Sequence, residues 1–288
     1  MTRGLKSGSP ASTRILIAGC GYVGTAAGRL LHAAGHTVFG VRRQPLALPS
    51  AIEPVGLDLL RDDLGSIPPA LDVIVWAVSP DSGDVDAYRA AFVDGPGRLL
   101  AFLARRGDAI RRAVLVASTS VWSCGEGEEV TETTPCQPDG YRGDHVLRAE
   151  AAFAHSGFPS VSLRFGGVYG PGRTGLLERI RRGQGHPPRR AVYGNRIWRD
   201  DGARAIVQVV GLDDPEPVYV VVDDEPADLR EVYAWLAAQL GVRLPAPRDQ
   251  PRRGGNKRCR NTRLRETGWA PAMPSYRHGY AALLGGRA

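Results

Sequence analysis

Three glycines near the N-terminus have the spacing that binds a dinucleotide. Gly19, Gly21 and Gly24 follow the apolar run RILIA and open a segment with helical periodicity. In a G-x-G-x-x-G turn the first glycine allows a tight bend, the second lets the backbone approach a pyrophosphate, and the third lets helix pack closely on strand. The free N–H groups and the dipole of the helix N-terminus favour the phosphates. The pattern predicts a dinucleotide site, and the alternative is a glycine-rich turn that binds no ligand.

Two arginines close the next apolar run, HTVFGV. Arg42 and Arg43 stand where an acidic residue would bind the ribose 2′-hydroxyl of NAD, whereas the 2′-phosphate of NADP requires positive charge. A guanidinium group matches a phosphate monoester in shape and charge, and a carboxylate would repel it. We therefore expect NADP(H) to be favoured over NAD(H). The alternative is that one or both arginines are only solvated.

The elements that position these residues alternate between strand and helix. The predicted strands are RILIAG, HTVFGV, 72–78, 112–118, 160–165 and 217–222, and the predicted helices are the segment after the glycine turn, 85–106, 144–155, 175–182 and 227–240. Strands that are apolar on both faces and alternate with helices belong to a parallel sheet that is covered on both sides. The predicted fold class is α/β, a Rossmann-type doubly wound parallel sheet.

Composition and charge narrow the class of protein further. The chain has 288 residues, 43% of them hydrophobic, and neither a long apolar run for a membrane span nor a secretory signal. Its net charge of +7 comes mostly from dispersed arginines, with one dense basic cluster at 248–265, so we do not expect nucleic acid as a partner. The scattered cysteines lack the spacing of a zinc site or a disulfide framework, which indicates a cytoplasmic protein without bound metal. Residues 1–12 are predicted to form a flexible tail.

Several segments, in family order along nearly the whole chain, resemble the short-chain dehydrogenase/reductase superfamily, and within it the extended or atypical group of NAD(P)-dependent epimerases and dehydratases. They are IAGCGYVG, GLDLLRD, VIVWAVSP, VLVASTSVW, VSLRFGGVYGPGR, GNRIWRDDGARAIV, VYVVVDDEP and NKRCRNTRLRETGWAPAMPSYRHGYAALL. The resemblance implies a cofactor-binding Rossmann core over 13–170. It implies that 171–288 form mainly a small lobe covering the substrate, with some segments returning to the core. Because the family often dimerises, a homodimer is the default expectation.

The same resemblance assigns roles to particular residues. Asp58 and Leu59 match a pair that lines the adenine, and Ala77 and Val78 match the strand end beside the cofactor ribose. Ser118 matches the catalytic Ser/Thr that hydrogen-bonds the substrate oxygen, and the alternative is a serine that only caps local backbone groups. The residues predicted to bind the cofactor are therefore Gly19, Gly21, Tyr22, Val23, Gly24, Arg42, Arg43, Asp58, Leu59, Ala77 and Val78.

The resemblance also implies roles for several further positions. The run 169–173 is expected to line the cofactor and substrate cleft, and Asp201 to anchor a loop over it. The segment 175–199 and the basic cluster near Lys257 are candidates for recognising a small, anionic substrate. Trp122 takes a place that often holds tyrosine.

The proton-transferring pair of the superfamily is altered in this chain. The family uses a tyrosine followed four residues later by a lysine on the same helix face, where the cation stabilises the phenolate. The corresponding pair here is Tyr141 and His145, without lysine. If the chain is instead aligned on LRAE, the two positions fall on Arg142 and Val146. Tyr141 is thus either the proton donor with His145 as its partner, or a helix-start tyrosine.

Three functions fit this sequence. The first is an NADPH-dependent oxidoreductase of the short-chain type, which transfers a hydride to or from a carbonyl, alcohol or imine substrate. The second is an epimerase or dehydratase that uses the nicotinamide cofactor transiently. The third is a non-catalytic NADP(H)-binding sensor, which the missing lysine favours.

Overall fold

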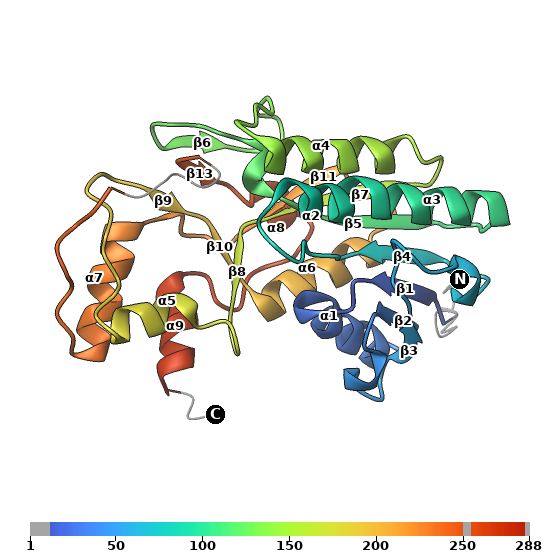
Figure 1. The fold of residues 1–288 in the computed structure, drawn as a ribbon, viewed down its shortest axis with the longest axis horizontal. Helices are drawn as coiled ribbons and strands as arrows, with labels where there is room; N and C mark the ends of the chain where they lie inside the picture. The colour runs from blue at the N-terminus through green and yellow to red at the C-terminus, as the bar shows by residue number, and fades with distance from the viewer. Residues whose placement is uncertain (1–11, 250–254, 286–288) are drawn as a thin grey trace, which may run out of the picture.

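A seven-stranded parallel sheet forms the centre of the molecule (Figure 1). The computed structural model describes residues 12–249 and 255–285. The strands lie in the order β11-β7-β5-β4-β1-β2-β3, and every neighbouring pair is parallel. Their bounds are β1 Arg14–Ala18, β2 Thr37–Arg42, β3 Glu53–Gly56, β4 Val73–Trp76, β5 Arg112–Ser118, β7 Ser160–Phe165 and β11 Val218–Val221.

Helices cover both faces of this sheet. The side chains of β1 alternate between the two, with Ile15 and Ile17 on one face and Leu16 on the other. On the first face β1 packs against α1 (Tyr22–Ala33) and α6 (Arg199–Gly211), and on the second against α3 (Gly95–Arg106) and α4 (Tyr141–Ala154). The arrangement confirms the predicted α/β, doubly wound Rossmann-type sheet.

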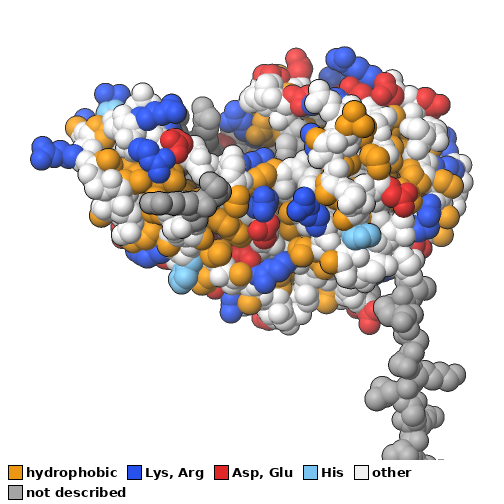
Figure 2. Space-filling model, turned by 90° about the horizontal axis from the view of Figure 1, so that it is seen from below, with side chains coloured by type: hydrophobic (Ala, Val, Ile, Leu, Met, Phe, Trp, Pro, Cys, Tyr) orange, Lys and Arg blue, Asp and Glu red, His pale blue; other side chains and the backbone are white. Residues whose placement is uncertain are grey.

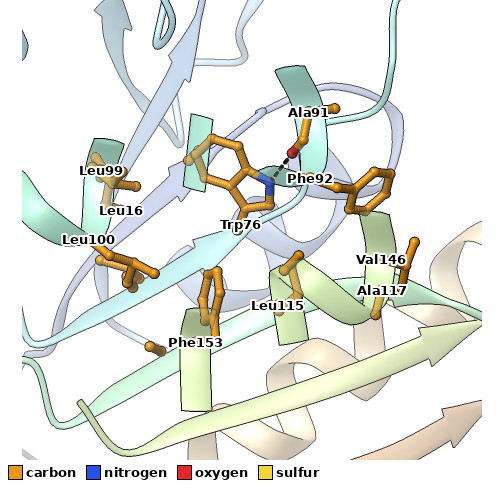
Figure 3. Close-up of a cluster of buried hydrophobic side chains, with 14 of the residues drawn as sticks. Leu16, Trp76, Ala91, Phe92, Leu99, Leu100, Leu115, Ala117, Val146 and Phe153 are labelled. Carbon is orange, nitrogen blue, oxygen red and sulfur yellow. Dashed lines mark hydrogen bonds between the residues drawn. The ribbon is translucent and has the colours of Figure 1, made fainter. Parts of the chain in front are cut away.

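The second face is built around Trp76 at the end of β4. Its indole Nε1 donates a hydrogen bond of 2.9 Å to the carbonyl oxygen of Ala91, and Leu99 and Phe153 pack into the same cluster (Figure 3). A side chain at Gly95 would lie 2.8 Å from the Trp76 ring, so the helix passes as close to the indole as a glycine allows. This contact fixes the segment that follows β4 against the sheet.

The predicted helix over 85–106 consists of three pieces. A short α2 (Val85–Arg89) continues through a π-turn, Ala90–Asp94, into α3. Pro96 has no N–H to donate to the carbonyl four residues earlier, and the Ala91 carbonyl is bound by Trp76, so ordinary helical hydrogen bonding is interrupted here. The helix ends at Gly107, whose φ of 77° is left-handed.

A smaller lobe is built mostly from the C-terminal half of the chain, beside the sheet (Figure 1). It has its own apolar cluster, which includes Leu177, Trp198, Val232 and Tyr276. Its helices are α5 Gly175–Arg181, α7 Leu229–Leu240 and α9 Tyr276–Gly285, and its short strand pairs are β8 Gly167–Tyr169 with β10 Arg196–Trp198 and β9 Tyr193–Gly194 with β12 Ala227–Asp228.

Parts of the C-terminal half return to the core. The helix α6 packs on the sheet, β11 is its edge strand, and α8 (Thr262–Glu266) contributes Leu264 to the first face. The strand β13 (Lys257–Cys259) pairs with β6 (Glu128–Val130). Three single-turn 3-10 helices complete the fold at Pro45–Ala47, Leu64–Ser66 and Thr119–Val121.

Two sequence predictions fall partly outside the described residues. Residues 1–11 of the predicted tail and residues 250–254 of the basic cluster lie outside the described residues. Within the described ranges, no helix has the length and apolar character that crossing a bilayer requires. On the face shown in Figure 2 the basic side chains are interspersed with acidic ones.

Candidate functional site

A cleft of about 890 Å³ opens at the carboxyl ends of the parallel strands. It lies where the strand order reverses between β1 and β4, which is where open α/β sheets bind ligands. Eleven of the predicted site residues line it: Gly19, Gly21, Tyr22, Val23, Arg42, Arg43, Asp58, Leu59, Ala77, Val78 and Ser118. Gly24, Tyr141 and His145 are outside the lining.

The glycine turn between β1 and α1 fits a pyrophosphate. Gly19 has a φ of +83°, and a side chain there would lie 2.5 Å from the backbone nitrogen of Val78. At Gly21 a side chain would meet only the Gly19 oxygen, at 3.9 Å, so the backbone is open to an approaching ligand. The helix α1 has neither a capping side chain nor an acidic residue in its first turn. Its N-terminal N–H groups can therefore bind phosphate oxygens without competition from a carboxylate.

Gly24 acts at a different place from the other two glycines. A side chain at this position would lie 2.7 Å from the Gly19 oxygen and 3.0 Å from Cγ2 of Ile17. Its absence from the cleft lining therefore agrees with the role of the third glycine, which is to let the helix pack closely on the strand.

The two arginines at the end of β2 differ in their surroundings. Arg42 is half-buried, and its side chain makes no hydrogen bond or ion pair within the described part of the chain. Arg43 binds both carboxylate oxygens of Asp81, at 2.8 and 2.7 Å. This hydrogen-bonded pair raises the pKa of Arg43 and lowers that of Asp81. Within the described ranges, Arg42 thus presents a guanidinium without a carboxylate partner to the cleft at this point.

Tyr22 connects the start of α1 to the turn that follows β8. Its hydroxyl donates a hydrogen bond of 2.8 Å to the carbonyl of Pro171. The guanidinium carbons of Arg173 and Arg199 lie 4.2 and 5.2 Å from the centre of its ring, and burial raises the pKa of its hydroxyl. Arg173 also lines the cleft, so the run 169–173 brings a cation to the pyrophosphate end of the site.

The remaining predicted cofactor residues lie at strand ends and in the turn after β3. The Oδ1 of Asp58 accepts a hydrogen bond of 2.9 Å from the backbone of Leu60, which shapes this turn, and Arg98 binds the carbonyl of Leu59 at 2.9 Å. Ala77 donates to the carbonyl of Ala18 at 2.8 Å, extending the pairing of β4 with β1 into the cleft wall.

Ser118 stands at the end of β5, where the cleft is also lined by Phe165 and Gly166. Its Oγ accepts a hydrogen bond of 3.2 Å from the backbone N–H of Ser120, so the residue caps the following 3-10 turn. Because the oxygen acts as acceptor in that bond, the hydroxyl proton remains available to a ligand. The capping and the substrate-binding interpretations of Ser118 are therefore compatible.

Tyr141 and His145 lie together at the start of α4. The Tyr141 hydroxyl donates a hydrogen bond to the Gly83 carbonyl, which also accepts one of 2.9 Å from Arg142. His145 is 7% exposed, its ring centre is 6.3 Å from that of Tyr141, and neither ring nitrogen has a hydrogen-bond partner within the described residues. Both side chains are thus near the wall of the site but outside its lining.

Further positions named from the sequence are buried inside the fold. Trp122 is buried and donates to the carbonyl of Thr134 at 3.0 Å. Asp201 is 1% exposed and accepts hydrogen bonds of 2.9 Å each from the backbone of Ala272 and Met273, so it anchors a loop, but these two residues do not line the cleft. Val146 is apolar and fully buried, so the alignment on LRAE places no cation in the lysine position.

Asp81 is a charged residue in the cleft lining that was not assigned from the sequence. It follows β4 by five residues. It lies beyond the carboxyl end of a strand at the sheet edge where the cleft opens, and that position is the signal that could have identified it.

The chain is similar in sequence and in structure to known proteins. Residues 15–219 match the model of the NAD dependent epimerase/dehydratase family. A putative NAD-dependent epimerase/dehydratase from Methylobacillus flagellatus is 32% identical, with 96% of this chain and 98% of that chain covered and a TM-score of 0.80. A conserved protein of unknown function from Silicibacter pomeroyi is 28% identical over 95% and 99% of the two chains, with a TM-score of 0.79.

A more distant structure shares the fold alone. The UDP-glucuronic acid 4-epimerase from Bacillus cereus, solved in complex with NAD, is 18% identical over 95% and 96% of the two chains, with a TM-score of 0.77. No curated protein sequence matches the chain. The family match covers most of the chain, and the Methylobacillus protein is similar over nearly its whole length. This chain therefore belongs to the NAD dependent epimerase/dehydratase family of enzymes.

Proposed function

We propose that this enzyme is an NADP(H)-dependent oxidoreductase that transfers a hydride to or from a small carbonyl, alcohol or imine substrate. One observation carries the proposal. A single cleft joins the open glycine turn at Gly21, the uncompensated guanidinium of Arg42, and the Ser118 hydroxyl. These groups suit the pyrophosphate, the adenosine 2′-phosphate and the substrate oxygen respectively.

The residues of the chain divide this work between binding and polarisation. When bound, the nicotinamide supplies the hydride. The backbone at Gly21 and the N-terminus of α1 hold the pyrophosphate, with Arg173 beside them. The hydroxyl of Ser118 donates a hydrogen bond to the substrate oxygen and stabilises the charge that develops there, and in the direction of reduction this oxygen takes its proton from solvent. Substrate specificity then depends on the groups that surround Ser118, among them Phe165 and Gly166.

The activity is tested by mixing the purified protein with NADPH and a panel of aldehydes, ketones and imines. Loss of reduced nicotinamide in proportion to product supports the oxidoreductase proposal. Product formation without net consumption of nicotinamide would indicate an epimerase or dehydratase instead.

The preference for NADP(H) is tested by removing both arginines. In the variant Arg42→Ala/Arg43→Ala we expect the dissociation constant for NADPH to rise about 30-fold and that for NADH to change by less than about threefold, because only NADPH has the 2′-phosphate. Isothermal titration calorimetry measures both. Arg61→Ala removes an exposed arginine outside the cleft and serves as the control. Equal weakening of the two nucleotides would refute the preference.

We infer that Tyr141 anchors the loop 79–84 rather than donating the proton. Its hydroxyl binds the Gly83 carbonyl of that loop, and it is outside the lining of the cleft that holds Ser118. A proton donor must come within hydrogen-bond reach of the substrate oxygen.

For Tyr141→Phe we therefore expect kcat to stay within about threefold of the wild-type value, because an anchoring hydrogen bond contributes only about 1 kcal/mol. Steady-state kinetics across pH measure this. A fall of about 100-fold, together with loss of one limb of the pH profile, would instead establish Tyr141 as the proton donor.

A second function, binding of NADP(H) without turnover, is favoured by the surroundings of Tyr141. The hydroxyl of Tyr141 is already bound, no lysine follows it on α4, and His145 is buried away from the cleft lining. Tight binding of NADPH by a protein that oxidises none of it across the substrate panel would support this function over the first.

A further inference from the structure

The acidic residue that faces the two arginines stands on the loop after β4. Asp81 lines the same end of the cleft as Arg42 and Arg43 and holds the Arg43 guanidinium through both of its carboxylate oxygens. We propose that Asp81 is a determinant of cofactor selectivity, which disfavours a 2′-phosphate and favours a free ribose 2′-hydroxyl. The inference rests on the proposed function, because it assumes that the cleft binds a pyridine nucleotide there.

The charged residues that line this end of the cleft are of both signs. Arg43 is paired with Asp81 and also feels the charge of Asp58, which helps to raise its pKa, whereas Arg42 has no partner among the described residues. The hydrogen bonds from Arg43 lower the pKa of Asp81, so this carboxylate is ionised at neutral pH. The pocket therefore attracts a dianionic group less strongly than two arginines alone would.

The Arg43–Asp81 pair is accessible enough for a ligand to compete with it. The two side chains are 62% and 68% exposed, and exposed ion pairs contribute little to stability. A phosphate monoester, which carries between one and two negative charges near neutral pH, can take the guanidinium away from the carboxylate. The carboxylate left beside it then repels the phosphate, whereas it accepts a hydrogen bond from a ribose hydroxyl.

The loop that carries Asp81 is held at its other end. Tyr141 and Arg142 both donate to the carbonyl of Gly83, two residues farther on, and Ser82 donates to the side chain of Asp84. Asp84 in turn accepts a hydrogen bond of 2.9 Å from the backbone of Ala87 and so caps α2. With these anchors the Asp81 carboxylate stays beside the arginines when a nucleotide enters.

The test replaces the carboxylate by its neutral isostere. In Asp81→Asn we expect the dissociation constant for NADP⁺ to fall about tenfold at low ionic strength, because one negative charge a few ångströms from a dianion is removed. The constant for NAD⁺ should rise by about threefold or less through the weaker hydrogen bond to its 2′-hydroxyl. The gain for NADP⁺ should shrink as salt is added, since the charges are exposed.

Asp86→Asn is the matched control. It removes the same charge five residues farther along the chain, at an exposed position in the first turn of α2 and outside the cleft lining. It should leave the ratio of the two constants unchanged. Calorimetric titration of wild type and both variants with NADP⁺ and NAD⁺ gives the six constants.

The outcomes separate this inference from the proposed function. If wild type binds neither nucleotide, both are wrong. If wild type binds and Asp81→Asn leaves the ratio unchanged or weakens NADP⁺, the selectivity role of Asp81 is overturned while the proposed function stands. A change of similar size in Asp86→Asn would likewise overturn it, because the effect would then come from the net charge of this region.

Discussion

Gly21→Ala is expected to lower the affinity for NADPH about 100-fold while the protein keeps its stability within about 1 kcal/mol. The protein without ligand has room for a side chain at this position, because the side chain would meet only the Gly19 oxygen, at 3.9 Å. A bound pyrophosphate must approach this backbone, so the added methyl group displaces it. A 100-fold change corresponds to about 2.7 kcal/mol, within the range that overpacking costs. Calorimetric titration and thermal unfolding of the same sample measure both quantities.

Two other glycines provide the comparison. Gly19→Ala should destabilise the protein itself, because its side chain would lie 2.5 Å from the backbone nitrogen of Val78 at a φ of +83°. Gly97 lies inside α3, and a side chain there would have no neighbouring atom within 4 Å. Gly97→Ala should therefore leave the affinity for NADPH unchanged. If Gly21→Ala bound NADPH as tightly as Gly97→Ala does, the glycine turn would not be the pyrophosphate site.

The sheet and its cofactor side could be predicted because their residues are constrained locally. Strands buried on both faces are rich in apolar residues, and six strands of the sheet are at least half apolar. The seventh strand, β3, was missed because Glu53–Gly56 is a short edge strand with one buried residue and a proline. The π-turn within 85–106 was missed because it depends on a hydrogen bond from Trp76, on another element.

The candidate site could be predicted only as far as single elements determine it. The glycine turn and the arginines lie at the carboxyl ends of the two strands of one βαβ unit, and so were identified together. The pairing of Arg43 with Asp81 joins residues 38 positions apart, and its existence depends on how the loop after β4 crosses the cleft. The direction of the Tyr141 hydroxyl likewise depends on the distant Gly83, so the helical spacing of Tyr141 and His145 predicted their proximity to each other but not which surface they face.

Ser118 is the residue on which the chemical step should depend most. In Ser118→Ala we expect kcat/KM to fall about 100-fold, because the substrate oxygen loses a hydrogen bond that strengthens as charge develops on it. The dissociation constant for NADPH should change by less than about threefold, since the proposed contact is with the substrate. Steady-state kinetics with the best substrate of the panel and calorimetric titration with NADPH measure the two effects.

The same substitution also removes a structural hydrogen bond, and the two effects must be separated. The Ser118 oxygen caps the turn at Thr119–Val121, which contributes about 1 kcal/mol to stability. Ser118→Thr keeps a hydroxyl for both roles and should retain most of the activity. Ser120→Ala removes a neighbouring hydroxyl that is buried and has no partner among the described residues, so it serves as the control. If Ser118→Ala and Ser120→Ala lost activity equally, the loss would reflect the packing of this turn, and the substrate oxygen would have to be bound elsewhere in the cleft.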